Sequence, residues 1–175
     1  MASMDGGMKV LDWKEQKRWS DKFLPEIKGI LGMHLIGEPP HEEDAERNTD
    51  LMVLRMDAVR IGCRVRRHNY LAQYGDEFTI RAGLRSGAKT ELTKVIEGWG
   101  DYFFYGFCDA EGTHLARWTL ADMRVFRIEY MRMLARSEVG KAPGISKENT
   151  DGNTSFAAFR WDAFPRDFIV GSSAS

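Results

Sequence analysis

Residues 59–67 read VRIGCRVRR and alternate between apolar and basic side chains along most of their length. The apolar positions are Val59, Ile61, Cys63 and Val65. Between them lie Arg60, Arg64 and Arg66. A period of two residues is typical of a β-strand, so this segment predicts a strand with one apolar face and one arginine face.

Neighbouring arginines on one strand face repel one another unless an anionic group lies opposite them. Two such groups are compatible with the sequence. One is the phosphate backbone of a nucleic acid, which guanidinium groups bind in a bidentate manner. The other is a set of the protein's own carboxylates, which would form an internal salt-bridge cluster.

Charges of opposite sign are separated along the chain. The segment EPPHEEDAERNTD, residues 38–50, carries six acidic residues and one arginine. The segment after it is mainly basic and includes Arg55, Arg60, Arg64, Arg66, Arg67, Arg81, Arg85, Lys89 and Lys94. An acidic cluster before a basic field favours a metal site beside a phosphate-binding surface. The structural alternative is a solvated acidic loop followed by a solvated basic sheet face, and the sequence leaves both open.

Composition predicts one globular domain. The chain has 175 residues, of which 43% are hydrophobic and 29% charged, enough for a core of ordinary size. No uninterrupted apolar run reaches the roughly 18 residues of a membrane span, so no membrane association is expected. Cys63 and Cys108 both lie in apolar strand-like runs. They predict two buried free thiols in a reducing compartment, and therefore a cytoplasmic protein.

The pattern of apolar residues predicts helices and strands in alternating groups. A helix is expected from Trp13, capped by Asp12 and split near Pro25. A hairpin is expected from residues 51–56 and 59–67, with a turn at Asp57-Ala58. A strand is expected at 77–83, with Phe78 and Ile80 inward and Thr79 and Arg81 on the other face. A helix capped by Thr90 or Ser86 is expected to end at Gly98. The remaining predicted elements are strands at 101–109 and 114–122, a helix from 123, a polar loop at 139–155 and a last strand or short docking piece from 156.

This order predicts an α+β fold with a single mixed β-sheet flanked by helices. The domain is expected to span residues 12–170, between a flexible N-terminus at 1–11 and a frayed tail at 171–175. Within it, the aromatic strand at 101–109 is expected to pack in the core, rather than to serve as a platform for stacking bases.

The element order from Trp13 to Asp122 resembles the core of the PD-(D/E)XK nuclease superfamily. That family has a restriction-endonuclease-like core of the order α-β-β-β-α-β. Its active site holds a divalent cation between an aspartate before one strand and an acid-x-lysine triplet on the next. Thr49-Asp50 occupies the place of the family's first motif, whereas Arg64-Val65-Arg66 stands where the triplet should be. Arginine can neither ligate a cation nor act as a base.

Some members of the superfamily carry the second acid on the helix that follows the strands. Glu91 and Lys94 are three residues apart in that helix and share one face. The resemblance therefore implies Mg²⁺ held by Asp50 and Glu91, with Lys94 orienting the attacking water, and phosphodiester hydrolysis as the reaction. Glu46 offers a further carboxylate. The alternative is an inactive site on a scaffold that only binds.

The leading functional hypothesis is a nucleic-acid-binding protein, with DNA favoured over RNA. Its predicted phosphate contacts are Arg60, Arg64, Arg66, Arg67 and Arg81. The alternative is a non-enzymatic phage or prophage interaction module that binds a protein partner. Salt dependence separates the two, because binding through several arginines weakens steeply as salt rises.

Overall fold

Helices and strands alternate along the chain in the computed structural model, which describes residues 13–37, 52–53, 59–149 and 152–173. The α-helices are α1 (Trp13–Asp21), α2 (Leu24–Leu35), α4 (Leu71–Tyr74), α5 (Glu91–Ile96) and α6 (Met123–Arg136). The strands are β1 (Ile36–Gly37), β2 (Met52–Val53), β3 (Ile61–Arg66), β4 (Glu77–Leu84), β5 (Tyr102–Cys108), β6 (Leu115–Asp122), β7 (Ile145–Glu148), β8 (Thr154–Arg160) and β9 (Ile169–Ser172). Three short 3-10 helices are η1 (His68–Tyr70), η2 (Trp161–Ala163) and η3 (Arg166–Phe168).

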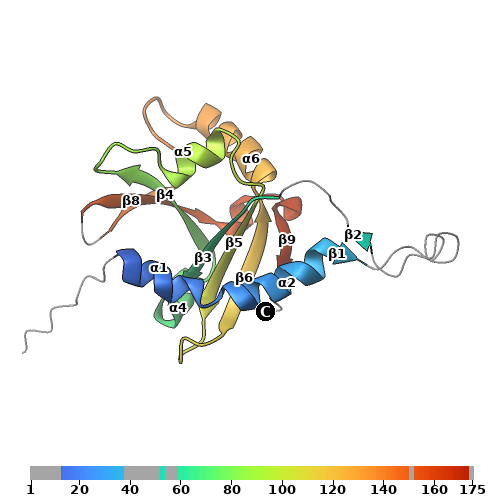
Figure 1. The fold of residues 1–175 in the computed structure, drawn as a ribbon. Helices are drawn as coiled ribbons and strands as arrows, with labels where there is room; N and C mark the ends of the chain where they lie inside the picture. Colours follow the sequence, from blue (N-terminus) through green and yellow to red (C-terminus); the bar gives the residue numbers. More distant parts are fainter. Residues whose placement is uncertain (1–12, 38–51, 54–58, 150–151, 174–175) are drawn as a thin grey trace, which may run out of the picture.

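These elements confirm the α+β class, with a mixed sheet flanked by helices (Figure 1). The mixed sheet has four strands in the order β3-β5-β6-β9. β3 runs parallel to β5, and the other neighbours are antiparallel. A single mixed sheet was predicted from the sequence, but β4, β8 and β7 form a separate three-stranded antiparallel sheet.

The predicted hairpin between residues 51–56 and 59–67 is wrong in the described part of the chain. Its first strand is described only at β2, which pairs with β1. β3 instead pairs with β5, in parallel register from Ile61–Tyr102 to Arg66–Phe107. The reason lies in β5, whose nearly continuous apolar sequence is buried on both faces and therefore takes a central position in a sheet. The predicted turn at Asp57-Ala58 lies outside the described residues.

Helices α1 and α2 cover one face of the four-stranded sheet (Figure 1). The predicted start at Trp13 and the predicted split near Pro25 are both confirmed, since α2 begins at Leu24. Proline is tolerated in the first turn of a helix, because its missing N–H would have no partner there. The buried residues of this helix-side cluster are Phe23, Ile27, Ile30, Leu31, Val65, Phe104, Cys108 and Leu120. Both carboxylate oxygens of Glu26 accept the backbone N–H of Leu115 at 3.1 Å, which ties α2 to β6.

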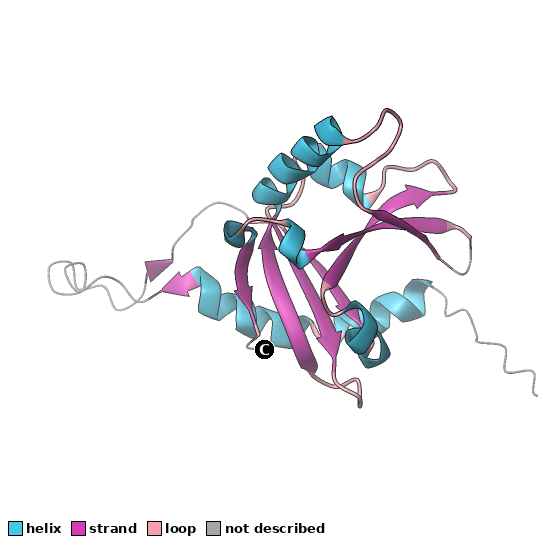
Figure 2. Ribbon diagram, turned by 180° about the vertical axis from the view of Figure 1, so that it is seen from behind, coloured by secondary structure: helices cyan, strands magenta, loops and turns pink. Residues whose placement is uncertain are grey.

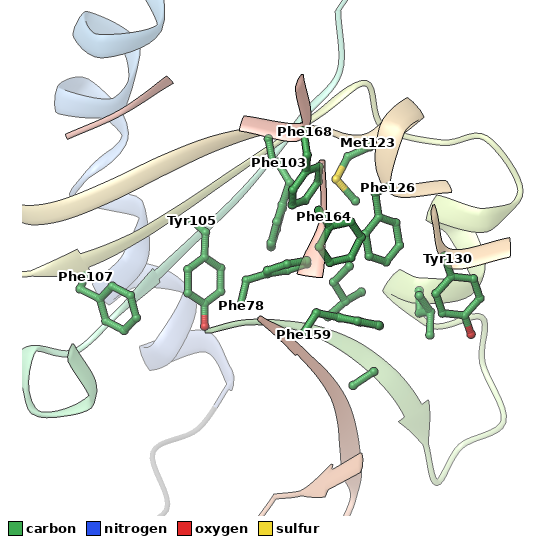
Figure 3. Packing of buried hydrophobic residues seen from close by; sticks show 14 residues of the cluster. Phe78, Phe103, Tyr105, Phe107, Met123, Phe126, Tyr130, Phe159, Phe164 and Phe168 are labelled. Carbon is green, nitrogen blue, oxygen red and sulfur yellow. The ribbon is translucent and has the colours of Figure 1, made fainter. Parts of the chain in front are cut away.

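The opposite face of the sheet packs against α6, η3 and the three-stranded sheet, as the view from behind shows (Figure 2). This inter-sheet cluster is strongly aromatic (Figure 3). Phe78 lies at its centre with no exposed surface. Its ring centroid lies 4.4–6.0 Å from those of Phe126, Phe159, Trp161, Phe164 and Phe168. The prediction that the aromatic strand packs in the core is confirmed, because Phe103, Phe104, Tyr105 and Phe107 are all buried.

Side-chain caps begin the two helices that flank this cluster. Thr90 accepts the backbone N–H of Thr93 at 3.1 Å, so the predicted cap of α5 is confirmed. Asp122 accepts the backbone N–H of Arg124 at 2.8 Å and forms an ion pair with its guanidinium. Burial raises the pKa of Asp122, but the hydrogen bonds and charge of Arg124 outweigh burial and hold that pKa below the ordinary value of 3.8.

Two chain segments are more ordered than the sequence indicated. The polar stretch 139–155 contains β7, which pairs with β8. The tail expected to fray from residue 171 continues β9 instead, because the backbone of Ser173 donates to Trp118 at 3.0 Å. The predicted flexible N-terminus at 1–11 lies outside the described residues.

The two cysteines are both free, but only one is buried as predicted. Cys108 lies on the central strand β5 within the helix-side cluster. Cys63 is exposed on β3, the outermost strand of the described sheet. No helix in the described ranges combines the length and the apolar character that crossing a membrane requires.

Candidate nucleic-acid interface

Strand β3 has the two predicted faces, and both of them point toward other parts of the protein. Ile61 and Val65 pack in the helix-side cluster. Arg64 and Arg66 point the other way, toward the junction between the two larger sheets, where their guanidinium groups meet side chains of β4, β5 and α5. The arginine face is therefore not a simple solvated surface.

Arg64 connects three elements of the fold. Its Nη1 donates to the backbone oxygen of Thr79 at 2.7 Å and to the Thr79 hydroxyl at 3.1 Å. Its Nη2 forms an ion pair with Glu91 in the first turn of α5. Only 20% of the Arg64 side chain is exposed, so this pair is screened less than a surface salt bridge. For Arg64, the anionic group opposite the strand is one of the protein's own carboxylates.

Arg66 extends the same polar network toward the aromatic core. Its Nη1 donates to the hydroxyl of Tyr105 at 3.4 Å, and that hydroxyl lies 3.3 Å from the hydroxyl of Thr79. Figure 3 shows the Tyr105 hydroxyl at the border of the inter-sheet cluster. Thr79 is buried, although alternation placed it on the outer face of its strand. Hydrogen bonds within this network satisfy polar groups that burial would otherwise destabilise.

Arg60, Arg67 and Arg81 are exposed. Together with Arg64 and Arg66 they form what we term the basic edge, which follows β3 and crosses to β4. From Arg60 to Arg67 the edge spans about 23 Å, at about 3.3 Å per residue of extended chain. Arg64 is the one member of this set with a carboxylate partner among the described residues.

Every guanidinium of the basic edge lies over an aromatic ring. The distances from the guanidinium carbon to the ring centroid are 5.5 Å for Arg60 over Trp99, 5.4 Å for Arg64 over Phe156, 4.4 Å for Arg66 over Tyr70, 4.9 Å for Arg67 over Trp19 and 6.0 Å for Arg81 over Phe156. An aromatic face attracts a cation through its quadrupole. Contact with a ring also restricts the motion of the arginine side chain.

The structure describes two of the three predicted catalytic residues, Glu91 and Lys94, both on α5. Asp50 lies outside the described residues. Glu91 is engaged by Arg64, and its Oε2 also accepts the backbone N–H of Arg81 at 3.1 Å. Lys94 is exposed on α5, one turn after Glu91.

Magnesium needs several oxygen ligands in near-octahedral geometry. The described residues supply one of the two predicted carboxylates, and the positive charge of Arg64 already neutralises it. Over the ranges that the structure describes, no three His, Cys, Asp or Glu side chains gather in a way that could hold a metal. Asp50, the other predicted ligand, lies outside the described residues, so magnesium binding stays a prediction.

Sequence reasoning found the arginines but missed their aromatic partners. Tyr70 follows Arg66 by four residues, whereas Trp19, Trp99 and Phe156 lie on segments distant from β3 in the sequence. One of these aromatic residues, Trp99, could have been recognised from the sequence. Trp99 stands between two glycines in the sequence EGWGD, which is unusual for a residue that belongs in a core.

Comparison with known proteins gave no match to a family model, to a curated protein or to a solved structure. The function of the chain is therefore inferred from geometry and charge.

Proposed function

We propose that this protein binds nucleic acid along the basic edge, with phosphate groups held by Arg60, Arg66, Arg67 and Arg81. One observation supports the proposal above others: each guanidinium of the edge lies over an aromatic ring. Proteins that bind a nucleic-acid backbone combine such cations with aromatic side chains. Arg64 is not one of the proposed phosphate contacts, because it forms an ion pair with Glu91.

The aromatic support makes the arginines suitable for phosphate. A free arginine side chain loses considerable rotamer entropy when it binds. A guanidinium already held against a ring loses less, and guanidinium N–H groups match the oxygens of a phosphate. A cytoplasmic location is also part of the proposal. Both cysteines of the chain are free, which is typical of proteins in a reducing compartment.

Fluorescence anisotropy with labelled DNA and RNA oligonucleotides tests the proposal. With four phosphate contacts, the logarithm of the binding constant should fall with the logarithm of salt at a slope of about −3 on single strands. Arg60→Gln, Arg67→Gln and Arg81→Gln should each weaken binding roughly fivefold and reduce the slope by about 1.

Arg136→Gln provides the matched control, because it removes the same charge from an exposed position on α6. It should leave the affinity and the salt slope nearly unchanged. If the wild-type protein binds no DNA or RNA at low salt, or if Arg136→Gln weakens binding as much as Arg67→Gln does, the proposal is wrong.

Hydrolysis of the bound strand remains a prediction of the nuclease resemblance. It would require Asp50 and a second acidic side chain. Glu91 could not be that second acid while it is paired with Arg64. Incubating labelled DNA with the protein and Mg²⁺, with EDTA as the control, measures it directly. Cleavage that disappears in Asp50→Ala while binding persists would support the resemblance; intact DNA under conditions of full binding would leave a scaffold that only binds.

A second candidate function is the docking of a protein partner on the outer face of α6. Ile128, Met131 and Leu134 are 53%, 51% and 41% exposed there. The helix carries four arginines and one glutamate, so its charge complements an acidic surface. A hollow of about 510 Å³ adjoins its C-terminal end, with Leu134, Val139 and Ala142 in its lining. The occupant that fits is an acidic amphipathic helix of another protein.

A synthetic amphipathic helix of leucine and glutamate residues is a suitable probe for this surface. The wild-type protein should bind the labelled peptide, and Ile128→Glu and Met131→Glu should each abolish binding through charge repulsion and lost apolar contact. Arg67→Gln, on the basic edge, serves as the control and should bind the peptide normally. Peptide binding that survives both glutamate variants, or that is absent from the wild type, would reject the docking surface.

A further inference from the structure

The loop between α5 and β5 presents a tryptophan to solvent. Trp99 is 58% exposed, and its backbone N–H donates to the oxygen of Lys94 at 3.0 Å. Gly98 and Gly100, on either side of it, have φ angles of 97° and 83°. Residues other than glycine rarely adopt this conformation, so the loop geometry depends on both glycines. The tryptophan is thereby held on a defined turn at the end of a helix.

The two glycines that flank this tryptophan in the sequence are not closely packed. A Cβ atom added at Gly98 or at Gly100 would meet no atom within 4 Å other than those of its chain neighbours. The glycines are therefore required by their backbone angles and not by close packing. They leave the indole without bulky neighbours in the sequence, so a flat group can approach it.

Arg60 is held beside the same indole by its backbone. Its N–H donates to the carboxylate of Asp101 at 2.8 Å, and its carbonyl oxygen accepts the N–H groups of Asp101 and Tyr102 at 2.8 Å and 3.1 Å. Asp101 follows Trp99 by two residues. These bonds fix the start of β3 relative to the loop, and the Arg60 guanidinium lies 5.5 Å from the centre of the indole.

We infer that Trp99 stacks on an unpaired nucleobase while Arg60 binds the adjoining phosphate, so that single-stranded nucleic acid is the preferred ligand of the basic edge. The inference rests on the proposed nucleic-acid binding and specifies its substrate class. Bases within a duplex are already stacked on their neighbours and are not available to a protein ring. A single strand offers a base face and a phosphate together, and stacking on an aromatic ring tolerates any base.

Binding of a single-stranded oligonucleotide and of a duplex of the same sequence, measured with Trp99→Ala and Trp99→Phe, tests this inference. Trp99→Ala should weaken single-strand binding roughly tenfold or more, because one stacked base is lost. Duplex binding should change by less than about twofold, since phosphate contacts dominate it. Trp99→Phe should retain most of the single-strand affinity, because phenylalanine also offers a stacking face.

Tryptophan fluorescence gives a second readout. The chain contains five tryptophans, and Trp99 is exposed beside the basic edge. A single-stranded oligonucleotide should quench part of the wild-type emission, and that component should be absent from Trp99→Phe. Urea unfolding of each variant should match the wild type, since the indole contributes an exposed surface.

The outcomes separate this inference from the proposed function. If Trp99→Ala binds single strands like the wild type while Arg67→Gln does not, the stacking role is wrong and nucleic-acid binding stands. Equal losses for single strand and duplex would reject the single-strand preference. Failure of the wild-type protein to bind either ligand would overturn both proposals.

Discussion

The two faces of the four-stranded sheet are closed in different ways. On the helix side, α1 and α2 cover it with an apolar cluster in which Phe23, Ile27 and Val65 are buried. On the inter-sheet side, the centre is packed with aromatic rings, but the contact along β3 is polar and runs through Arg64 and Glu91. The same strand thus contributes valine to one face and arginine to the other.

This difference shows how an arginine-bearing strand can serve both structure and binding. Aromatic packing closes the two sheets against each other at β5 and β6. At β3, an edge strand of the four-stranded sheet, Arg64 donates to Thr79 on β4 and forms an ion pair with Glu91 on α5. The arginines farther along this edge extend beyond the junction into solvent, and those exposed positions are available to a ligand.

The largest loss of stability is expected at the centre of the inter-sheet cluster. Phe78→Ala should lower the free energy of unfolding by about 3–5 kcal/mol, because it leaves a cavity among several aromatic rings. On the helix side, Ile27→Ala should lower it by about 2–4 kcal/mol. Urea unfolding followed by circular dichroism measures both. A larger loss for Ile27→Ala than for Phe78→Ala would show that the helix side, and not the aromatic side, dominates the core.

The polar junction should contribute less than the aromatic centre. A double-mutant cycle with Arg64→Met and Glu91→Gln should give a coupling energy of about 1–3 kcal/mol, because both groups are partly buried. The exposed pair Lys141–Glu138 is the control, and its cycle should show no resolvable coupling. Equal coupling in the two cycles would mean that Arg64 is no more structural than a surface residue.

A smaller, pH-dependent effect is expected at the cap of α6. Asp122→Ala should lower the stability by about 1 kcal/mol at pH 7. The folded-state pKa of Asp122 lies below its ordinary value, so its charged form is stabilising above about pH 4, and this contribution is lost as the pH falls through the folded pKa. Unfolding at pH 7 and at pH 3 should therefore show a difference from the wild type that shrinks in acid. Asp122→Asn keeps a capping side chain and isolates the charge; a difference that grows in acid would contradict the assignment.

The smallest effect on stability is expected at the exposed part of the basic edge. Arg67→Gln should change the free energy of unfolding by less than about 0.5 kcal/mol, since Arg67 is exposed and has no carboxylate partner among the described residues. Arg64→Gln should destabilise the protein measurably in the same assay. Similar values for the two would remove the distinction between the structural and the exposed arginines.

Local patterns predicted the elements well, because side-chain period and capping are encoded over a few residues. The aromatic run from Tyr102, the helix after Asp122 and the cap at Thr90 are confirmed. Strand partners were predicted less well. β3 was expected to pair with residues 51–56 in a hairpin, yet β3 and β4 each pair with a strand that lies farther along the chain. Alternation defines the faces of a strand, but it does not identify the neighbouring strand.

The candidate site shows the same division. The sequence identified the arginines and offered a phosphate or a carboxylate as their partner. The structure gives Arg64 a carboxylate, that of Glu91 on α5. The acidic segment 38–50 lies outside the described residues. Tyr70 follows its partner Arg66 by four residues, but the rings beside Arg60, Arg67 and Arg81 come from distant segments that only the folded chain brings to them.

The pairing of β4 with β8 also bears on how the chain folds. Glu77 at the start of β4 forms an ion pair with Lys147, which is 70 residues later in the sequence. During synthesis β4 is complete long before its neighbour β8 exists. β4 also lies in the chain segment that connects β3 to β5. Pairing between strands so distant in sequence slows folding. Until it pairs, the edge of a strand can associate with other chains. The C-terminal segment from β7 onward therefore completes the three-stranded sheet. In a chain that lacked this segment, the Phe78 ring would be exposed.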